Sequence, residues 1–457
     1  CVCLGLQNQE HAPCEVELFL PNELKHFQIA TGLPSKSLVK GRFTLKGDNY
    51  DQLIDSPFEL AEQSRFSFEA NGIPHEFVIS GQHNTNLERL KTDIEKICQT
   101  EINMFGSAPF QNYTFMTMAT GNSYGGLEHC NSTSLITPRD DLPKADEAEE
   151  PSKDYQRFLG LCSHEYFHSW LVKFIRPENF ANYDLQKEGY TSLLWIFEGF
   201  TSYYDDLILL RSGVISQTSY LELLKAQIDR YLQNPGRAIQ SVSESSFDAW
   251  IKFYRQDENS NNAGTSYYNK GSLVALCLDL GLRLRGSSLD AVMRRLYENA
   301  QQGIQVNERT IFDLCQELTS DNWVEQINHL IYTTDELPLD QLLPEFGLSY
   351  VLKNEKSLPF GLKAVDKADG VVIQQVRRDS AAARAGLSAQ DVIIAIDGLK
   401  ASEKLLAQYA KQQGAFTMYT FRRDELMQFE VQGGENPLST VDLKVEDQSK
   451  LENWLNI

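Results

Sequence analysis

Residues 163–168 of this 457-residue chain read Ser-His-Glu-Tyr-Phe-His, so two histidines stand four positions apart with a glutamate directly after the first. On an α-helix, residues at i and i+4 lie on one face, and both imidazoles can therefore bind the same metal ion. Glu165 then leans toward the coordination position that is left open for water. The motif predicts a zinc-binding helix with His164 and His168 as ligands and Glu165 as general base. The alternative, two structural histidines on a buried helix, leaves the intervening glutamate unexplained.

A catalytic zinc ion needs a third protein ligand and keeps its fourth position for water. The candidate is Glu198, a lone carboxylate in the apolar run 194–200. A buried carboxylate without a partner is costly, and a metal ion removes that cost. The alternative is a helix whose glutamate pairs with a basic neighbour. Asp205 lies seven residues later on the same helix face, and we expect it either to hydrogen-bond a ligand histidine or to be a solvated acid.

Changes in the pattern of apolar and polar residues divide the sequence into three domains and a tail. Residues 1–85 contain short alternating stretches separated by Gly, Pro and Asn, which is typical of a β-rich domain. Residues 86–335 show mainly helical periodicity, and residues 336–435 return to short strands. Residues 436–457 are expected to form a C-terminal tail. The predicted fold class is therefore α+β and multidomain.

Charge and composition argue against two classes of protein. The chain carries 42 Lys and Arg against 63 Asp and Glu, a formal net charge of −21, whereas nucleic-acid binding needs surplus basic residues. No apolar run approaches the roughly 18 residues of a membrane span, since Asp279 interrupts even residues 273–280. Eight scattered cysteines without a CxxC pair favour a reduced interior, and therefore a cytoplasmic location.

Two further segments give the chain a family resemblance. The zinc motif followed by residues 195–200, Trp-Ile-Phe-Glu-Gly-Phe, resembles the gluzincin metallopeptidases. Residues 124–129, Tyr-Gly-Gly-Leu-Glu-His, are similar to the exopeptidase motif in the form used by the glycyl aminopeptidase family. Residues 266–271, Ser-Tyr-Tyr-Asn-Lys-Gly, resemble the Tyr-x-Lys-Gly segment of that family. The family also ends in a PDZ domain, so the resemblance covers nearly the whole chain in the right order.

The resemblance implies a fold and a reaction. The catalytic part is expected to be a thermolysin-like, mainly helical domain between an N-terminal β-domain and a PDZ-like domain. The family usually has a longer N-terminal β-domain than residues 1–85, so we expect this sequence to lack the beginning of that domain. The implied activity is zinc-dependent hydrolysis of N-terminal residues from peptides, with a preference for small residues such as Gly and Ala.

The resemblance also assigns roles to single residues. Glu128 is expected to bind the free α-ammonium of the substrate, on a strand edge opened by Gly125 and Gly126. Tyr268 matches the catalytic tyrosine of the family and would donate to the developing oxyanion, with adjacent Tyr267 as the alternative if the register shifts by one. Without the family, the Gly-Gly-x-Glu segment would more often be a turn and either tyrosine part of the core.

The third domain is expected either to bind a peptide or only to pack against the catalytic domain. Residues 379–393 resemble the bacterial PDZ pattern of a short helix, a Gly turn and a strand. PDZ domains add a peptide as a strand and hold its carboxylate in a loop of backbone N–H groups. The expected loop is formed by Phe360, Gly361 and Leu362. If the domain only packs against the catalytic one, Gly361 is an ordinary turn residue.

The sequence therefore predicts a zinc metalloaminopeptidase that acts on peptides with a free N-terminus. Two alternatives from other functional classes stay open. The first is a gluzincin endopeptidase, in which Glu128 would not bind an amine. The second is a catalytically silent PDZ adaptor with a relict metal site, and the intact Glu165 and Tyr268 argue against it.

Overall fold

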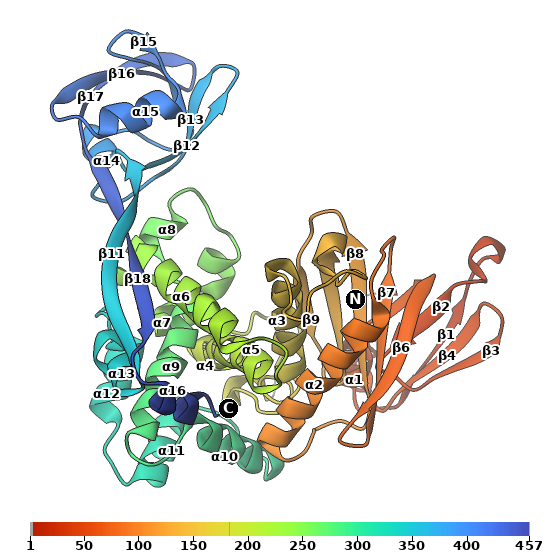
Figure 1. Ribbon diagram of the computed structural model, residues 1–457. Coiled ribbons are helices and arrows are strands. Elements are labelled where there is room, and N and C mark those ends of the chain that lie inside the picture. Colours follow the sequence, from red (N-terminus) through yellow and green to blue (C-terminus); the bar gives the residue numbers. More distant parts are fainter. Residues whose placement is uncertain (1–2, 182, 457) are drawn as a thin grey trace.

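The computed structural model describes residues 3–181 and 183–456 of the chain. Figure 1 shows small N-terminal sheets, a central body of helices with one larger sheet, and a β-rich domain that projects from this body on a two-stranded ribbon. Among the described residues, no helix combines the length and apolar character that crossing a lipid bilayer requires.

The N-terminal part consists of two small antiparallel sheets. One sheet has the strand order β1-β4-β3, and the other pairs β2 with β5. Leu33, Leu45 and Leu53 form a small core between them and helix α1. The elements are β1 (Cys14–Phe19), β2 (Gln28–Thr31), β3 (Ser35–Val39), β4 (Arg42–Gly47), α1 (Tyr50–Ile54) and β5 (Phe58–Ala61).

A five-stranded mixed sheet follows, in the order β6-β7-β8-β10-β9. The inner strands β7, β8 and β10 are parallel, and the edge strands β6 and β9 are antiparallel to their neighbours. Strands β6 and β7 lie before residue 85 but belong to this sheet, so the boundary lies at about residue 62 and not at residue 85. Alternating apolar and polar residues predict a half-buried strand, but they do not predict which sheet the strand joins. The strands are β6 (Gln63–Ala70), β7 (Ile73–Ser80), β8 (Tyr113–Thr120), β9 (Gly125–Glu128) and β10 (Ser132–Pro138).

Helices fill the rest of the central body. Helix α2 packs against both strand β6 and helix α3, and one continuous apolar core joins the sheet to the helices. The helices are α2 (Leu87–Phe105), α3 (Lys153–Phe167), α4 (Leu194–Phe197), α5 (Gly199–Arg211), α6 (Gln217–Gln233), α7 (Val242–Phe247), α8 (Ser260–Ala263), α9 (Asn269–Arg283), α10 (Leu289–Gln301), α11 (Thr310–Thr319), α12 (Val324–Tyr332) and α13 (Leu339–Glu345). The segment Ala249–Phe253 forms a π-helical turn.

Two glycines let helices α5 and α9 touch backbone to backbone. A Cβ atom added to Gly199 would lie 2.6 Å from the Cα atom of Gly271, and one added to Gly271 would lie 2.9 Å from the Cα atom of Gly199. Neither helix has room for a side chain at this crossing. The contact brings the start of α5, which follows Glu198, against the start of α9, which follows Tyr268.

The projecting domain has a core of its own, which includes Ile373, Ile393 and Met418. It stands on a ribbon formed by β11 (Leu348–Pro359) and β18 (Glu435–Val445). A hydrogen bond links this domain to the central body: the side-chain amide of Asn262 on helix α8 donates to the carbonyl oxygen of Val376 at 2.8 Å. Its other elements are β12 (Leu362–Lys367), β13 (Gly370–Val376), α14 (Ala381–Ala385), β14 (Val392–Ile396), β15 (Leu399–Lys400), α15 (Glu403–Ala410), β16 (Ala415–Arg422) and β17 (Glu425–Gln432).

Residues 436–457 were expected to form a tail, but the described part of this segment returns to the central body. Strand β18 completes the ribbon, and helix α16 (Gln448–Leu455) buries Leu451, Trp454 and Leu455 in the main core. The reason is physical: a helix of eight residues carries too few turns for its apolar face to stand out in the sequence.

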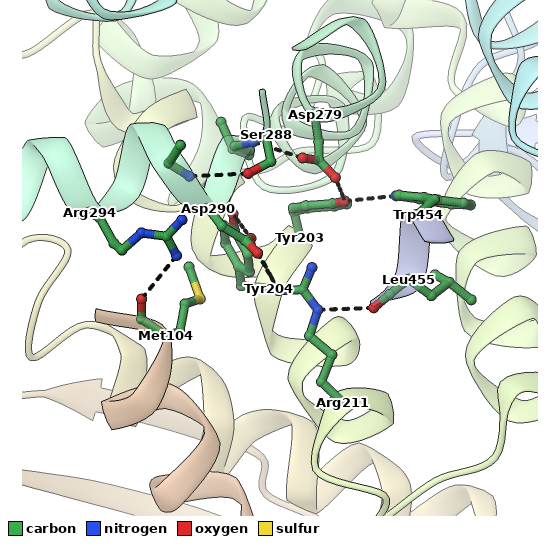
Figure 2. A network of polar contacts seen from close by, with 12 residues as sticks. Met104, Tyr203, Tyr204, Arg211, Asp279, Ser288, Asp290, Arg294, Trp454 and Leu455 are labelled. Carbon is green, nitrogen blue, oxygen red and sulfur yellow. Dashed lines mark hydrogen bonds and ion pairs between the residues drawn. The ribbon is translucent and has the colours of Figure 1, made fainter. Parts of the chain in front are cut away.

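Polar contacts fasten helix α16 to the core, as Figure 2 shows. The indole Nε1 of Trp454 donates to the hydroxyl of Tyr203 at 3.4 Å, and that hydroxyl donates to Asp279 at 2.8 Å. Nε of Arg211 donates to the carbonyl oxygen of Leu455 at 3.2 Å. Arg211 also pairs with Asp290 on helix α10 at 3.1 Å. Helix α16 is thus tied to helices α5, α9 and α10 of the central body.

The crossing of α5 and α9 predicts the effect of adding one methyl group. Gly199→Ala is expected to destabilise the protein by about 1–3 kcal/mol, because the extra atom has no space in a packed core. The midpoint of urea unfolding, followed by circular dichroism, measures this. Gly160→Ala on helix α3 is the control, since its nearest neighbour would lie at an ordinary 3.7 Å. Equal midpoints for the two variants would contradict the tight crossing.

Candidate active site

Helix α3 presents both histidines on one face. The helix begins after Ser152, whose hydroxyl accepts the backbone N–H of Tyr155, and His168 stands at its C-terminal end. The imidazole centroids of His164 and His168 lie 4.6 Å apart. Their Nε2 atoms lie 3.3 and 3.2 Å from Oε2 of Glu198. The structure therefore brings together the three residues that the sequence predicted as metal ligands.

The environment of Glu198 fits a bound cation. The residue lies at the junction between helices α4 and α5, and its Oε2 atom is buried without a hydrogen-bond donor among the described residues. The three ligand atoms lie within 4.8 Å of one another. Since a buried carboxylate oxygen without a partner is costly, this arrangement suits a divalent ion between the carboxylate and the two imidazoles. His164, His168 and Glu198 are the residues that would hold zinc.

Hydrogen bonds orient both histidine rings. Nδ1 of His168 lies 2.8 Å from the carbonyl oxygen of Leu171, which can only accept, so Nε2 keeps its lone pair for a metal. Nδ1 of His164 lies 3.0 Å from Oδ2 of Asp205. Of the two alternatives for Asp205, the structure therefore shows the contact with a ligand histidine. Such contacts fix ring orientation and raise the basicity of the ligand nitrogen.

Glu165 lies between the ligand cluster and strand β9. A Cβ atom on Gly126 would lie 2.3 Å from Oε1 of Glu165, so only glycine fits at this position of the strand. Burial raises the pKa of Glu165 to about 7, and its Oε2 atom has no hydrogen-bond donor among the described residues. A carboxyl group that titrates near neutrality can accept and release a proton, as a general base must.

Strand β9 brings the predicted amine-binding residue to the same place. Glu128 ends this edge strand, whose residues 125 and 126 carry no side chain. The strand pairs with β10 on one side and lies against helix α3. Ligand-type atoms of Glu128, Glu165 and His168 lie within 4.8 Å of one another. Glu128 therefore lies beside the candidate metal ligands His164, His168 and Glu198 but is not one of these three.

The structure distinguishes the two candidate tyrosines. The ring of Tyr268 lies 6.1 Å from the ring of His164, and its hydroxyl lies 3.3 Å from the hydroxyl of Tyr254. Tyr267 is 1% exposed, its ring centroid lies 4.7 Å from that of Tyr268, and it lines the adjoining cleft. Burial raises the pKa of Tyr268 far above its ordinary value, so its hydroxyl keeps the proton that a donor needs. This geometry favours Tyr268 as the oxyanion donor.

A cleft of about 1360 Å³ leads to these residues, and both Glu128 and Glu198 line it. Its walls also include Asp55, Lys173 and Tyr254. The sequence alone did not point to these three. No local motif marks them, because Asp55 comes from the N-terminal part and Tyr254 follows the π-helical turn.

The loop predicted to bind a peptide carboxylate has its own partners. Phe360 and Gly361 have φ values of 56° and 81° and connect β11 to β12. The N–H of Phe360 donates to the carbonyl oxygen of Gly434 at 2.9 Å, and that of Gly361 to Leu358 at 3.0 Å. These two donors are engaged within the chain. Peptide binding by Phe360, Gly361 and Leu362 therefore stays a prediction.

The fold and the site together define a metallopeptidase. An edge strand of a mixed sheet passes beside a helix with two histidines, and the third ligand comes from the junction of the next two helices. An acidic residue, Glu165, stands next to the first histidine and faces the strand.

Comparisons with known proteins identify the family. The model for M61 glycyl aminopeptidase matches residues 157–274, that for the Peptidase M61 N-terminal domain matches residues 1–62, and that for a PDZ domain matches residues 358–431. The crystal structure of an aminopeptidase N family protein from Idiomarina loihiensis is 40% identical, with a TM-score of 0.93 over 99% of this chain and 81% of that chain. The chain belongs to the M61 glycyl aminopeptidase family, which confirms the resemblance and the α+β multidomain architecture.

More distant structures also align. An M1 zinc metallopeptidase from Deinococcus radiodurans is 13% identical, with a TM-score of 0.47 over 72% of this chain and 65% of that chain. A search of the curated proteins found no match.

The contact between His164 and Asp205 predicts an effect on metal affinity. Asp205→Asn is expected to weaken zinc binding about ten- to hundred-fold, because the ligand imidazole loses its charged partner. Competition with a chromogenic chelator measures the affinity. Asp313→Asn on helix α11 is the control, since this exposed carboxylate pairs with Arg309. Equal affinities for the two variants would show that Asp205 does not support the site.

Proposed function

We propose that the protein is a zinc-dependent aminopeptidase that hydrolyses the first peptide bond of peptides with a free N-terminus and prefers small first residues such as Gly and Ala. The observation that carries the proposal is the place of Glu128, whose carboxylate lies within 4.8 Å of ligand-type atoms of Glu165 and His168. A carboxylate beside the reacting centre but outside the ligand set suits a cationic group of the substrate. Membership of a glycyl aminopeptidase family supports the preference for small residues.

The residues of the site divide the reaction among them. A zinc ion bound by His164, His168 and Glu198 supplies Lewis acidity, which polarises a carbonyl group and acidifies water. Glu165 accepts the proton of the attacking water and later delivers it to the leaving amine. The hydroxyl of Tyr268 donates a hydrogen bond to the developing oxyanion.

Glu128 determines where the substrate is cut. Its carboxylate binds the α-ammonium, and this contact places the first peptide bond next to Glu165. Because Gly126 has no side chain, the backbone of the substrate can approach the strand edge closely. Internal peptide bonds carry no ammonium at the corresponding place, so the contact restricts hydrolysis to the chain end.

The role of Glu165 is tested by an isosteric change. Glu165→Gln is expected to lower kcat on Gly- and Ala-amides at least about 10³-fold, because the amide cannot accept the proton, and to leave the zinc content unchanged. Stopped assays and metal analysis measure the two quantities. Glu101→Gln is the control: Glu101 is fully buried outside the ligand set, and its Oε1 atom accepts a hydrogen bond from Ser163 that the amide oxygen of glutamine can also accept. Retained turnover in Glu165→Gln would refute the assignment of the base.

The role of Glu128 is tested with blocked substrates. N-acetylation of a Gly- or Ala-initiated peptide is expected to lower kcat/KM at least about hundred-fold, because a charged contact is lost. Glu128→Gln is expected to remove most of this discrimination. Equal rates on free and acetylated peptides would identify an endopeptidase instead. A zinc-loaded protein that turns over no member of a panel of free peptides would identify a silent PDZ adaptor.

A further inference from the structure

A cluster of charged groups from two domains lies next to Glu128. Asp55 stands at the C-terminal end of helix α1, and its Oδ1 atom accepts a hydrogen bond from Nζ of Lys173 at 2.5 Å. Its Oδ2 atom accepts the backbone N–H of Cys130 at 2.9 Å. Nδ1 of His129 lies 3.4 Å from Oδ1. The carboxylate thus joins Lys173 to the two residues that directly follow Glu128.

The pair is largely removed from water. The side chains of Asp55 and Lys173 are 20% and 19% exposed, so their charges interact more strongly than those of a surface ion pair. Burial by itself would raise the pKa of Asp55, but the contacts with His129 and Lys173 outweigh it and hold that pKa well below its ordinary value. Asp55 is therefore ionised throughout the pH range in which a peptidase works.

The backbone directs Lys173 into the cleft. Its N–H donates to the carbonyl oxygen of the ligand residue His168 at 3.0 Å. The preceding residue, Val172, has a φ of 142°, which a β-branched residue rarely adopts. Strain of this kind persists only where the surrounding structure imposes it, and it is concentrated at functional sites. The chain leaving the zinc helix is thus held in one conformation that takes Lys173 to the cleft.

In the cleft, two carboxylates can attract the ammonium of Lys173. Asp55, Glu128 and Lys173 all line the same cleft. Glu128 forms no ion pair with any residue in 3–181 or 183–456. The ammonium of Lys173 already interacts electrostatically with the carboxylate of Glu128. Without another partner, this ammonium would therefore compete with the α-ammonium of the substrate for Glu128. Asp55 provides the alternative partner that prevents this competition.

We propose that Asp55 is a positioning residue for the aminopeptidase reaction: it holds the ammonium of Lys173 away from Glu128, so that the α-ammonium of the substrate is the cation that Glu128 binds. The inference rests on the proposed function, in which Glu128 binds the amine. It makes the N-terminal part of the chain a component of substrate recognition. The bond from Cys130 to Asp55 also fixes the end of the strand that carries Glu128.

The test compares two small zinc chelators that differ in one ammonium group, glycine hydroxamate and acetohydroxamate. Isothermal titration calorimetry on the zinc-loaded protein gives the ratio of their affinities without any turnover. Asp55→Asn, whose amide can still accept the N–H of Cys130, is expected to lower the preference for glycine hydroxamate about ten-fold. The double variant Asp55→Asn/Lys173→Met is expected to regain most of it, because the competing cation is gone. For Gly-amides, KM should follow the same order while kcat changes little.

Each outcome has a definite meaning. The proposal is overturned if Asp55→Asn keeps the full preference for glycine hydroxamate. It is also overturned if the double variant prefers this chelator as weakly as Asp55→Asn does. Lys173→Met alone is expected to keep at least the preference of the unmodified protein, and a loss there would also overturn it, even if Asp55→Asn fails to fold. A lack of preference in the unmodified protein would instead contradict Glu128 as the amine-binding residue. Asp321→Asn, which breaks a 2.6 Å pair with Arg285 outside the cleft, is the control and should change nothing.

Discussion

The Oε2 atom of Glu198 is buried beside the Nε2 atoms of two histidines, and the rest of the catalytic body holds it there. A negative group in such a place needs a compensating cation, because the interior offers it no donor. Helix α5 starts directly after this residue and crosses α9 at Gly199 and Gly271, so the carboxylate has little freedom to move away. Metal binding and the stability of this region are therefore linked: an ion that fits the three ligands also relieves the burial of Glu198.

The clustering of the candidate metal ligands with Glu165 was predictable because their geometry is local. The spacing of His164 and His168 places both on one face of any helix, whatever surrounds it. Glu198 was predictable because a lone acid in an apolar run needs an explanation. The segment around Gly126 and Glu128 needed the family resemblance, since by itself it resembles a turn. The structure adds the reason for the glycine, which is the close approach of Glu165.

The remaining features depend on how distant segments pack, and no local pattern contains that information. Asp55 meets Lys173 only because the N-terminal part folds against the loop after the zinc helix. The expected boundary at residue 85 fell too late because strands β6 and β7 join the catalytic sheet. The PDZ-like domain was recognised from a local pattern of helix, Gly turn and strand, whereas the N–H of Phe360 in its loop donates to Gly434, which lies 74 positions away.

The ribbon of β11 and β18 makes the PDZ-like domain an insertion in the catalytic fold. Both of its connections leave and re-enter the same body, and helix α16, which follows them, supplies Trp454 to the catalytic core. During synthesis, the core can close only after the whole PDZ-like domain has emerged from the ribosome. A chain truncated at the start of the PDZ-like domain would also lose helix α16, which is part of the catalytic core. Replacing only the residues between strands β11 and β18 would leave the sequence of that core intact. The catalytic body and the PDZ-like domain, each with a core of its own, are thus inherited and made together.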